Sequence, residues 1–273
     1  MMLVPKLALC NFLADVVELR RLALASGFSG VDWSFNLDDL PGNALEEARL
    51  VKRIARLQPL EVRYHCAFNG LDLGDAEARK ADEAMEIFRR ACRLVHNLDG
   101  RYMTIHLGLG RDTAEGLSWE RSLERLADLV GYGRSLGVCI CLENLAWGWT
   151  SRPELFEKLV RRSASGVTLD IGHARVSPSI KSQRFSLEDF VTPHQKQVFN
   201  AHIYHEETED GHLPPATLED VRERLDLLGT LPCDWWVLEL RNLNDLMATR
   251  KIVQAFLEGQ PAKIADESHT ASP

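Results

Sequence analysis

Short apolar runs and longer amphipathic stretches alternate along almost the whole chain. The apolar runs are rich in β-branched and aromatic residues and are bounded by turn-forming residues, which is typical of strands. They predict strands at residues 6–10, 30–35, 61–66, 102–107, 138–143, 166–171, 198–203 and 235–240. Apolar positions at helical spacing predict helices near 14–27, 43–57, 75–97, 116–136, 152–163, 217–229 and 243–258, with a longer connection and a short helix at about 174–185.

Eight strand-helix units in succession predict one closed parallel barrel, because right-handed crossovers leave few other topologies for such a series. No Pro/Gly/Ser-rich linker interrupts the series, and 273 residues suit a single barrel. We therefore expect an α/β fold, a single (β/α)8 TIM barrel over residues 1–259. The polar, aperiodic segment 260–273 predicts a disordered tail, and His269 within it is not a candidate ligand.

Composition narrows the class of protein. The hydrophobic fraction of 45% is that of a folded globular chain. A net charge of −8 disfavours nucleic acid as a partner, because binding to a polyanion relies on Lys and Arg. Asp15 and Glu18 interrupt the first apolar run, which predicts neither a signal peptide nor a membrane span. The six cysteines form no C-x-x-C pair, so we expect buried free thiols and a cytoplasmic protein, and a homo-oligomer stays open.

Imidazole and carboxylate side chains recur at or just after the ends of the predicted strands three to eight. The carboxyl ends of barrel strands meet at one rim, where the active sites of this fold collect. A single histidine of this kind is more often an ordinary hydrogen-bonded or surface residue, but a whole set in register predicts one shared site. Its candidate residues are His65, His106, Glu143, Asp170, His173, His202, Asp210, His212 and Glu239.

Four of these candidates follow four consecutive strands and predict a metal site. They are Glu143, Asp170, His202 and Glu239. Together they would give one divalent ion an octahedral set of ligands with two free positions. Asp210 and His212 lie in an acidic loop and are spaced to bind together, although a solvated surface turn explains that loop equally well.

The remaining loops offer pocket residues rather than ligands. Strands one and two supply no obvious ligand, and the side chains expected at most to line the pocket are Asn11, Asp32, Trp33 and Phe35. Aromatic candidates for stacking on a sugar are Trp33, Phe68, Trp147 and Trp149, each of which could equally be a packing residue. A local basic rim could form from Arg111, Arg175, Lys181 and Arg184, which are otherwise ordinary solvated loop charges.

These motifs resemble the xylose isomerase-like barrel superfamily, which includes sugar isomerases and epimerases and the type-four apurinic endonucleases. The resemblance covers about residues 5–258. It rests on YHC, IHLG, LEN, DIGH, AHIYH, EDGHLPP and LEL at the ends of strands three to eight. The Asp170-x-x-His173 pair and the Asp-x-His-Leu-Pro loop are its most specific parts.

The resemblance implies two different metal sites. In the isomerases and epimerases, the residues matching Glu143, Asp170, His202 and Glu239 bind one divalent ion, and the residue matching His173 contacts substrate. The matching glutamates also move protons next to a carbonyl. In the endonucleases, the positions matching all nine candidates hold three zinc ions that activate water at a phosphate.

The leading hypothesis from the sequence is a divalent-metal-dependent sugar or sugar-phosphate isomerase or epimerase. It works through a metal-stabilised ene-diolate, with Glu143, Glu239 and His173 as catalytic residues and His65, His106, Trp33 and Trp147 as substrate-binding residues. Zn²⁺, Mn²⁺, Co²⁺ or Mg²⁺ is the expected cofactor, without a nucleotide, and a small sugar is the expected partner. One alternative is a hydrolase or lyase of the same barrel with multinuclear zinc, and another is a non-catalytic metal-binding protein.

Overall fold

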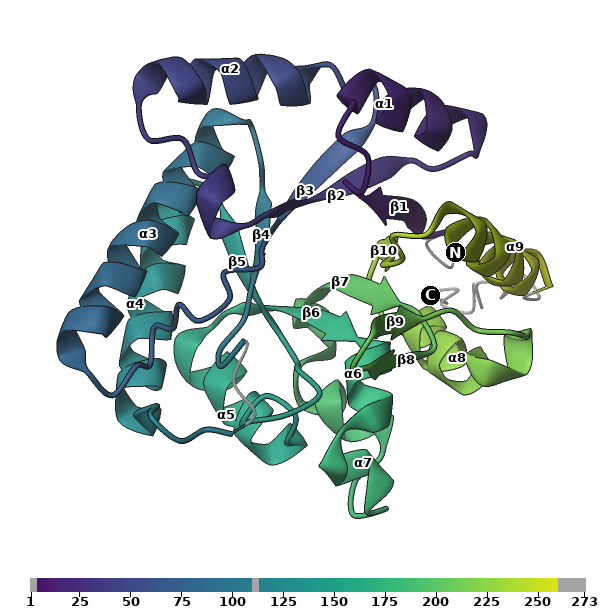
Figure 1. Ribbon diagram of the computed structural model, residues 1–273. Coiled ribbons are helices and arrows are strands. Elements are labelled where there is room, and N and C mark those ends of the chain that lie inside the picture. Colours follow the sequence, from purple (N-terminus) through teal and green to yellow (C-terminus); the bar gives the residue numbers. More distant parts are fainter. Residues whose placement is uncertain (1–3, 110–112, 260–273) are drawn as a thin grey trace, which may run out of the picture.

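The computed structural model describes residues 4–109 and 113–259. The tail predicted at 260–273, with His269, and the loop residue Arg111 lie outside the described residues. Eight parallel strands close into a barrel in the order β1-β10-β7-β6-β5-β4-β3-β2, with helices around the outside (Figure 1). These strands are β1 (Lys6–Cys10), β2 (Gly30–Phe35), β3 (Glu61–Cys66), β4 (Tyr102–Ile105), β5 (Cys139–Glu143), β6 (Gly166–Asp170), β7 (Val198–Ile203) and β10 (Trp235–Leu238). The predicted single (β/α)8 barrel is confirmed.

The helices pack their apolar faces on the outer side of the barrel. They are α1 (Val16–Ala25), α2 (Ala44–Ala55), α3 (Ala78–Asn97), α4 (Trp119–Ser135), α5 (Pro153–Ser163), α6 (Ile171–Val176), α7 (Pro178–Lys181), α8 (Arg222–Thr230) and α9 (Leu243–Gly259). Short 3₁₀ turns occur at Leu37–Asp39, Leu187–Phe190, Thr192–Gln197 and Leu218–Asp220. Within the described ranges, no helix has the length and apolarity to cross a membrane. The cysteines are free thiols, and all are buried except Cys139, which is half-buried.

Two connections at the carboxyl rim differ from the prediction. Helix α6 begins directly after Asp170, whose carboxylate accepts a hydrogen bond from the His173 backbone N–H at 2.7 Å and so caps the helix. The acidic loop after β7 is an antiparallel hairpin of β8 (Glu206–Thr208) and β9 (Gly211–Leu213). The sequence does not reveal this hairpin, because strands of three residues are too short to give a periodic pattern.

Strands β4 and β10 also end two residues earlier than predicted, at Ile105 and Leu238. His106 and Glu239 therefore lie just beyond their strands, and they still belong to the rim.

The barrel interior is polar near the site, because side chains at alternate strand positions point inward. Below the rim, the Thr104 and Thr168 hydroxyls hydrogen-bond to each other at 2.7 Å, and the Asn200 amide donates to Thr168 at 3.0 Å. The buried Arg63 guanidinium donates to the Asn200 side chain and to the Phe199 carbonyl, both at 2.8 Å. Arg63 is thus the central cation of a hydrogen-bonded layer that supports the rim from below.

We expect Arg63→Ala to lower the free energy of unfolding by about 3 kcal/mol, because the change leaves buried acceptors without a donor. It also removes the stacking of Arg63 on Tyr102 and Trp235, at 4.2 and 4.6 Å from the ring centroids. Urea unfolding checks the value. Arg49→Ala on the exposed face of α2 is the matched control, with an expected change below about 0.5 kcal/mol. Equal effects of the two changes would contradict a structural role of Arg63.

Candidate metal centre

Each barrel strand brings one side chain to the rim at the same inward-facing level. Seven of these eight side chains are imidazoles or carboxylates, and the eighth is a thiol. In strand order from β1 they are Cys10, Asp32, His65, His106, Glu143, Asp170, His202 and Glu239. All are buried except Glu239, which is half-buried. Because the barrel closes, these strand-end side chains lie together and form one cluster of possible ligand atoms.

Glu143 lies at the centre of this cluster, and its two carboxylate oxygens face different groups. The Oε2 atom lies 3.5 Å from His65 Nε2 and 3.3 Å from His106 Nε2. The Oε1 atom lies 3.4 Å from His202 Nδ1. His65 and His106 approach each other to 3.2 Å between their Nε2 atoms. With its two oxygens facing different imidazoles, Glu143 could contribute to two separate ion sites.

The first ligand group contains Glu143, Asp170, His202 and Glu239, whose nearest ligand atoms all lie within 4.8 Å of one another. His202 Nδ1 lies 2.9 Å from Glu239 Oε2 and 3.8 Å from Asp170 Oδ2. Glu239 is the most accessible of the four, with 16% of its side chain exposed. This group can hold one ion and still be reached from the solvent.

The second group is His65, His106 and Glu143, which also meet within 4.8 Å. Asp32 lies behind His65, with its Oδ2 atom 3.6 Å from His65 Nδ1. A carboxylate on one ring nitrogen directs the other nitrogen toward the metal. Asp32 also meets His65 and His202 within 4.8 Å, as a further set of possible ligands. Sequence reasoning missed this set because Asp32 was expected only to line the pocket.

A third group contains His173, Glu207 and His212. The His173 Nδ1 atom lies 3.0 Å from the Asn144 carbonyl, and His212 Nδ1 lies 2.7 Å from the Glu239 carbonyl. Because a carbonyl only accepts, both Nδ1 atoms are donors and both Nε2 atoms are left as ligands. Glu207 Oε2 lies 3.0 Å from His212 Nε2 and 4.0 Å from His173 Nε2. The group is complete without Asp210.

The hairpin explains why Glu207 and not Asp210 completes this group. Glu207 lies on β8 opposite His212 on β9, so the two side chains pair across the hairpin. Asp210 lies in the turn and is exposed. The structure thus gathers eight of the nine predicted site residues and leaves Asp210 outside these ligand groups. Sequence spacing alone favoured Asp210, since a hairpin of this register was not predicted.

Packing around Tyr204 fixes the position of His212. The two rings are stacked, with centroids 3.9 Å apart and an interplanar angle of 4°. Gly172 of α6 permits this arrangement, because a Cβ there would lie 2.1 Å from the Tyr204 ring. The tyrosine therefore links α6 to the hairpin and holds both sides of the third group in place.

The donor set fits divalent metal ions. Several buried polar atoms of the cluster have no hydrogen-bond partner, and a buried polar atom without a partner is destabilising. They include His65 Nδ1, His106 Nδ1, Glu143 Oε2, Asp170 Oδ2, both ring nitrogens of His202 and Glu207 Oε2. Imidazole nitrogen with carboxylate oxygen is the set that zinc, manganese and cobalt accept.

The pKa values of the metal-free cluster follow from burial and from close charges. Burial lowers the pKa of His202, but the nearby Glu239 and Glu143 carboxylates outweigh burial and raise that pKa well above its usual range. Burial also lowers the pKa of His212, and Glu239 with Glu207 brings it to about 10. Burial raises the pKa of Asp170 to about 6. Without metal, protons therefore occupy His202 and His212 near neutral pH.

We expect metal binding at pH 7.5 to release about two protons per chain, because His202 and His212 must lose their protons to become ligands. Affinity should increase with pH and should fall steeply below pH 6, where Asp170 also becomes protonated. Calorimetry in buffers of different ionisation enthalpy measures the released protons. A binding enthalpy that is the same in all buffers would contradict this prediction.

The predicted substrate-contact residues separate into two sets. Trp33 lines a cavity beside the cluster, and the Trp147 ring lies 6.2 Å from the His173 ring. Phe68 is buried against Phe88, and Trp149 packs edge-on against Trp119, so these two are packing residues.

The predicted basic rim is only partly neutralised among the residues that the structure describes. Arg175 forms an ion pair with Glu206 at 3.2 Å, and Lys181 and Arg184 are exposed.

A family model described as "Xylose isomerase-like TIM barrel" matches residues 20–256. The match spans most of the chain. The chain belongs to the xylose isomerase-like TIM barrel family. An uncharacterized protein of Methanocaldococcus jannaschii is 26% identical over 166 residues, which are 60% of this chain and 71% of that protein. Members of this family are mostly enzymes, and the family commonly uses divalent metals.

Solved structures of the xylose isomerase-like family share the fold. A D-tagatose 3-epimerase-like protein superposes with a TM-score of 0.70 at 19% identity, covering 93% of this chain and 97% of that one. Endonuclease IV from Thermus thermophilus gives a TM-score of 0.67 at 18% identity, covering 93% and 99%. Epimerase and nuclease structures are thus almost equally similar, so the fold does not choose between the two chemistries.

Proposed function

We propose that this chain is a multinuclear metal-dependent hydrolase of phosphate esters, acting on a phosphodiester of small-molecule size. The observation that carries the proposal is Glu143, whose two oxygens face two separate ligand groups. Metal pairs that share a carboxylate are typical of phosphatases and nucleases, where both ions act on one phosphate. We therefore prefer a hydrolase to the isomerase or epimerase that was the leading hypothesis from the sequence.

The surroundings of Glu143 also argue against its use as a base on carbon. Its side chain is 1% exposed, and imidazole nitrogens of His65, His106, His173 and His202 lie within 3.6 Å of it. A general base must come within hydrogen-bond distance of the proton that it removes. Glu143 has no open side for a substrate, whereas it is well placed to hold ions.

The ligand groups would hold separate ions. Glu143, Asp170, His202 and Glu239 would hold one ion, and the other two groups would hold further ions. Bound divalent ions would supply positive charge to the phosphate oxygens and lower the pKa of a water molecule.

Glu239 is the member of the first ligand group that solvent and substrate can reach most easily. The His202 and His212 imidazoles lower the pKa of Glu239 although burial raises it, so this carboxylate is ionised at neutral pH. The ionised Glu239 is therefore suited to bind a cation, and its side chain is the most accessible of the first group.

The direct test is hydrolysis of bis(p-nitrophenyl) phosphate by protein loaded with Zn²⁺, Mn²⁺ or Co²⁺. We expect metal-dependent release of nitrophenol that EDTA stops. An abasic DNA duplex serves as a second substrate, and we expect weaker cleavage of it, because the chain carries a net charge of −8. Fully loaded protein that cleaves no phosphoester would contradict the hydrolase proposal.

A second candidate is the sugar or sugar-phosphate isomerase or epimerase. The first ligand group favours it, because those four residues suffice for one ion and Glu239 remains accessible. Incubation of ketoses in deuterated water tests it, since proton transfer next to the carbonyl would exchange hydrogen for deuterium in a metal-dependent way. Exchange without phosphoester cleavage would favour the isomerase. Retained metal without activity in either assay would favour a non-catalytic metal-binding protein.

A further inference from the structure

A separate cavity lies beside the metal centre, at the carboxyl ends of β1 and β2 and against α2. Its volume is about 360 Å³, which suits part of a small molecule. Cys10 forms the shared wall, because it lines the cavity and its thiol donates to the Leu240 carbonyl at 3.5 Å. Leu240 lies between Glu239 of the centre and Arg241 of the cavity. Cys10 and the segment 239–241 thus place the cavity next to the metal centre.

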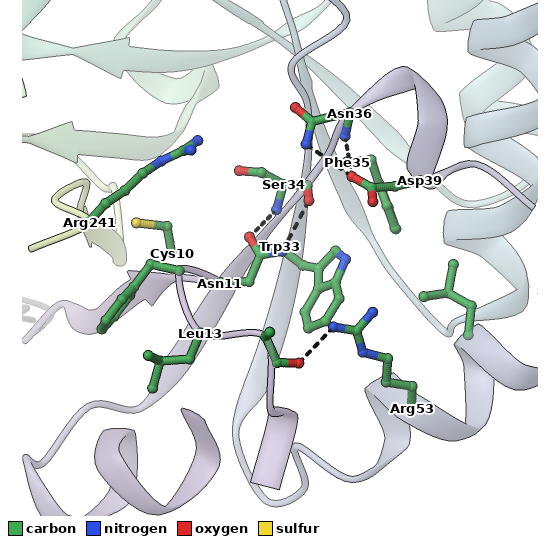
Figure 2. A pocket seen from close by; sticks show the side chains of 13 residues that line it. Cys10, Asn11, Leu13, Trp33, Ser34, Phe35, Asn36, Asp39, Arg53 and Arg241 are labelled. Atoms are coloured by element: carbon green, nitrogen blue, oxygen red, sulfur yellow. Dashed lines mark hydrogen bonds between the residues drawn. The ribbon is translucent and has the colours of Figure 1, made fainter. Parts of the chain in front are cut away.

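Two arginines face the cavity. Figure 2 shows Arg241 and Arg53 pointing toward it from different sides, with Asn11 and Ser34 between them. Arg53 is held in place, since its Nη2 atom donates to the Ala14 carbonyl at 2.9 Å and its guanidinium stacks over Trp33 at 5.3 Å. The cavity thus has a fixed cation on an aromatic wall and a second cation opposite.

Arg241 combines the absence of a partner with a place in the cavity lining. It is exposed, and among residues 4–109 and 113–259 it has neither an ion pair nor a hydrogen bond from its side chain. Some surface arginines have acidic partners, as Arg152 does with Glu154 at 2.6 Å and Arg161 with Glu157 at 2.6 Å. A chain with a net charge of −8 has many carboxylates to offer, yet Arg241 points into a cavity instead.

Two other polar side chains of the cavity are already engaged. The Asn11 amide is paired with the Ser34 backbone, donating to its carbonyl at 3.1 Å and accepting from its N–H at 2.8 Å. The one carboxylate of the lining, Asp39, accepts from the Asn36 backbone N–H at 2.8 Å and from its amide at 3.1 Å. Of the charged side chains in the lining, Arg241 is therefore the one without a partner among the described residues.

We propose that this cavity binds a second anionic group of the substrate, a phosphate or a carboxylate, and that Arg241 is the residue that recognises it. A guanidinium offers parallel N–H donors that match either oxyanion in a bidentate arrangement. The proposal rests on the phosphoester hydrolase proposed above. It narrows the substrate to a small phosphodiester whose reacting phosphate lies at the centre and whose second anion lies in the cavity.

Kinetics with matched esters tests the proposal. The probes are the p-nitrophenyl phosphodiester of glycerol and the same ester with a terminal phosphate or a terminal carboxylate. We expect the ratio of kcat/KM between a charged and the neutral ester to fall about 10- to 100-fold in Arg241→Met, mostly through KM, because charged hydrogen bonds to the second anion are lost. Arg49→Met, an exposed arginine on α2, should keep the ratio of the wild type. A ratio unchanged in Arg241→Met would overturn the proposal.

A binding measurement separates this proposal from the hydrolase assignment. The Arg241 Nε–H resonance, assigned by its absence in Arg241→Met, should shift and saturate on titration with inorganic phosphate or acetate, and should not respond to chloride. If no ester is hydrolysed but this resonance responds, the hydrolase assignment fails and the anion site stands. A resonance that stays in place with both anions would overturn the anion site, whatever the enzyme hydrolyses.

Discussion

Glu143→Gln is expected to reduce turnover by about 1,000-fold or more and to remove more than one metal ion per chain. The substituted amide keeps the shape of the side chain but loses the charge. Because Glu143 faces both the His65 and His106 group and the His202 group, one substitution weakens two ion sites at once. Steady-state kinetics with bis(p-nitrophenyl) phosphate and metal analysis of the same sample measure the two effects.

The matched control is Glu124→Gln, since Glu124 is exposed on α4 and away from the rim. It removes the same charge and should leave metal content and turnover within about twofold of the wild type. An active Glu143→Gln protein with its full metal content would show that Glu143 is not a required metal ligand.

Glu207→Gln is expected to reduce turnover by about 100-fold and to remove the ion of the third group alone, because Glu207 is the carboxylate between His173 and His212. Asp210→Asn is the matched comparison in the same hairpin. Asp210 is exposed in the turn, so its substitution should have an effect smaller than about threefold. Titration with Zn²⁺ followed by calorimetry should show one binding step fewer in Glu207→Gln only.

The opposite result is equally informative. A large loss in Asp210→Asn with little change in Glu207→Gln would show that the hairpin rearranges when metal binds. The Asp210-His212 pair expected from the sequence would then be the ligand pair.

The sequence predicted the barrel because each strand and helix carries its own local signal. Apolar runs mark the strands, and the periodic apolar faces of α2 and α5 mark helices whatever their neighbours do. The errors lie where structure depends on contacts between short segments. The hairpin of β8 and β9 has three-residue strands, and α6 begins on a side-chain cap from Asp170. Neither leaves a periodic pattern in the chain.

The candidate site was predicted in part for a similar reason. Strand-end histidines and carboxylates are visible in the sequence, since the rim collects them wherever a barrel closes. The partner of each is not visible. Asp32 reaches His65 across the β2–β3 pair, and Glu207 reaches His212 across the hairpin. No sequence motif marks Arg241 either. Its lack of a carboxylate partner becomes visible only in the folded structure.

The number of metal ions per chain tests the central proposal most directly. Inductively coupled plasma mass spectrometry of the protein as purified, and again after saturation with Zn²⁺ and removal of free metal, gives this number. A multinuclear hydrolase predicts two or three ions per chain, held by the groups around Glu143 and His173. A single ion per chain at saturation would contradict the shared role of Glu143 and would return the preference to a one-metal isomerase or epimerase.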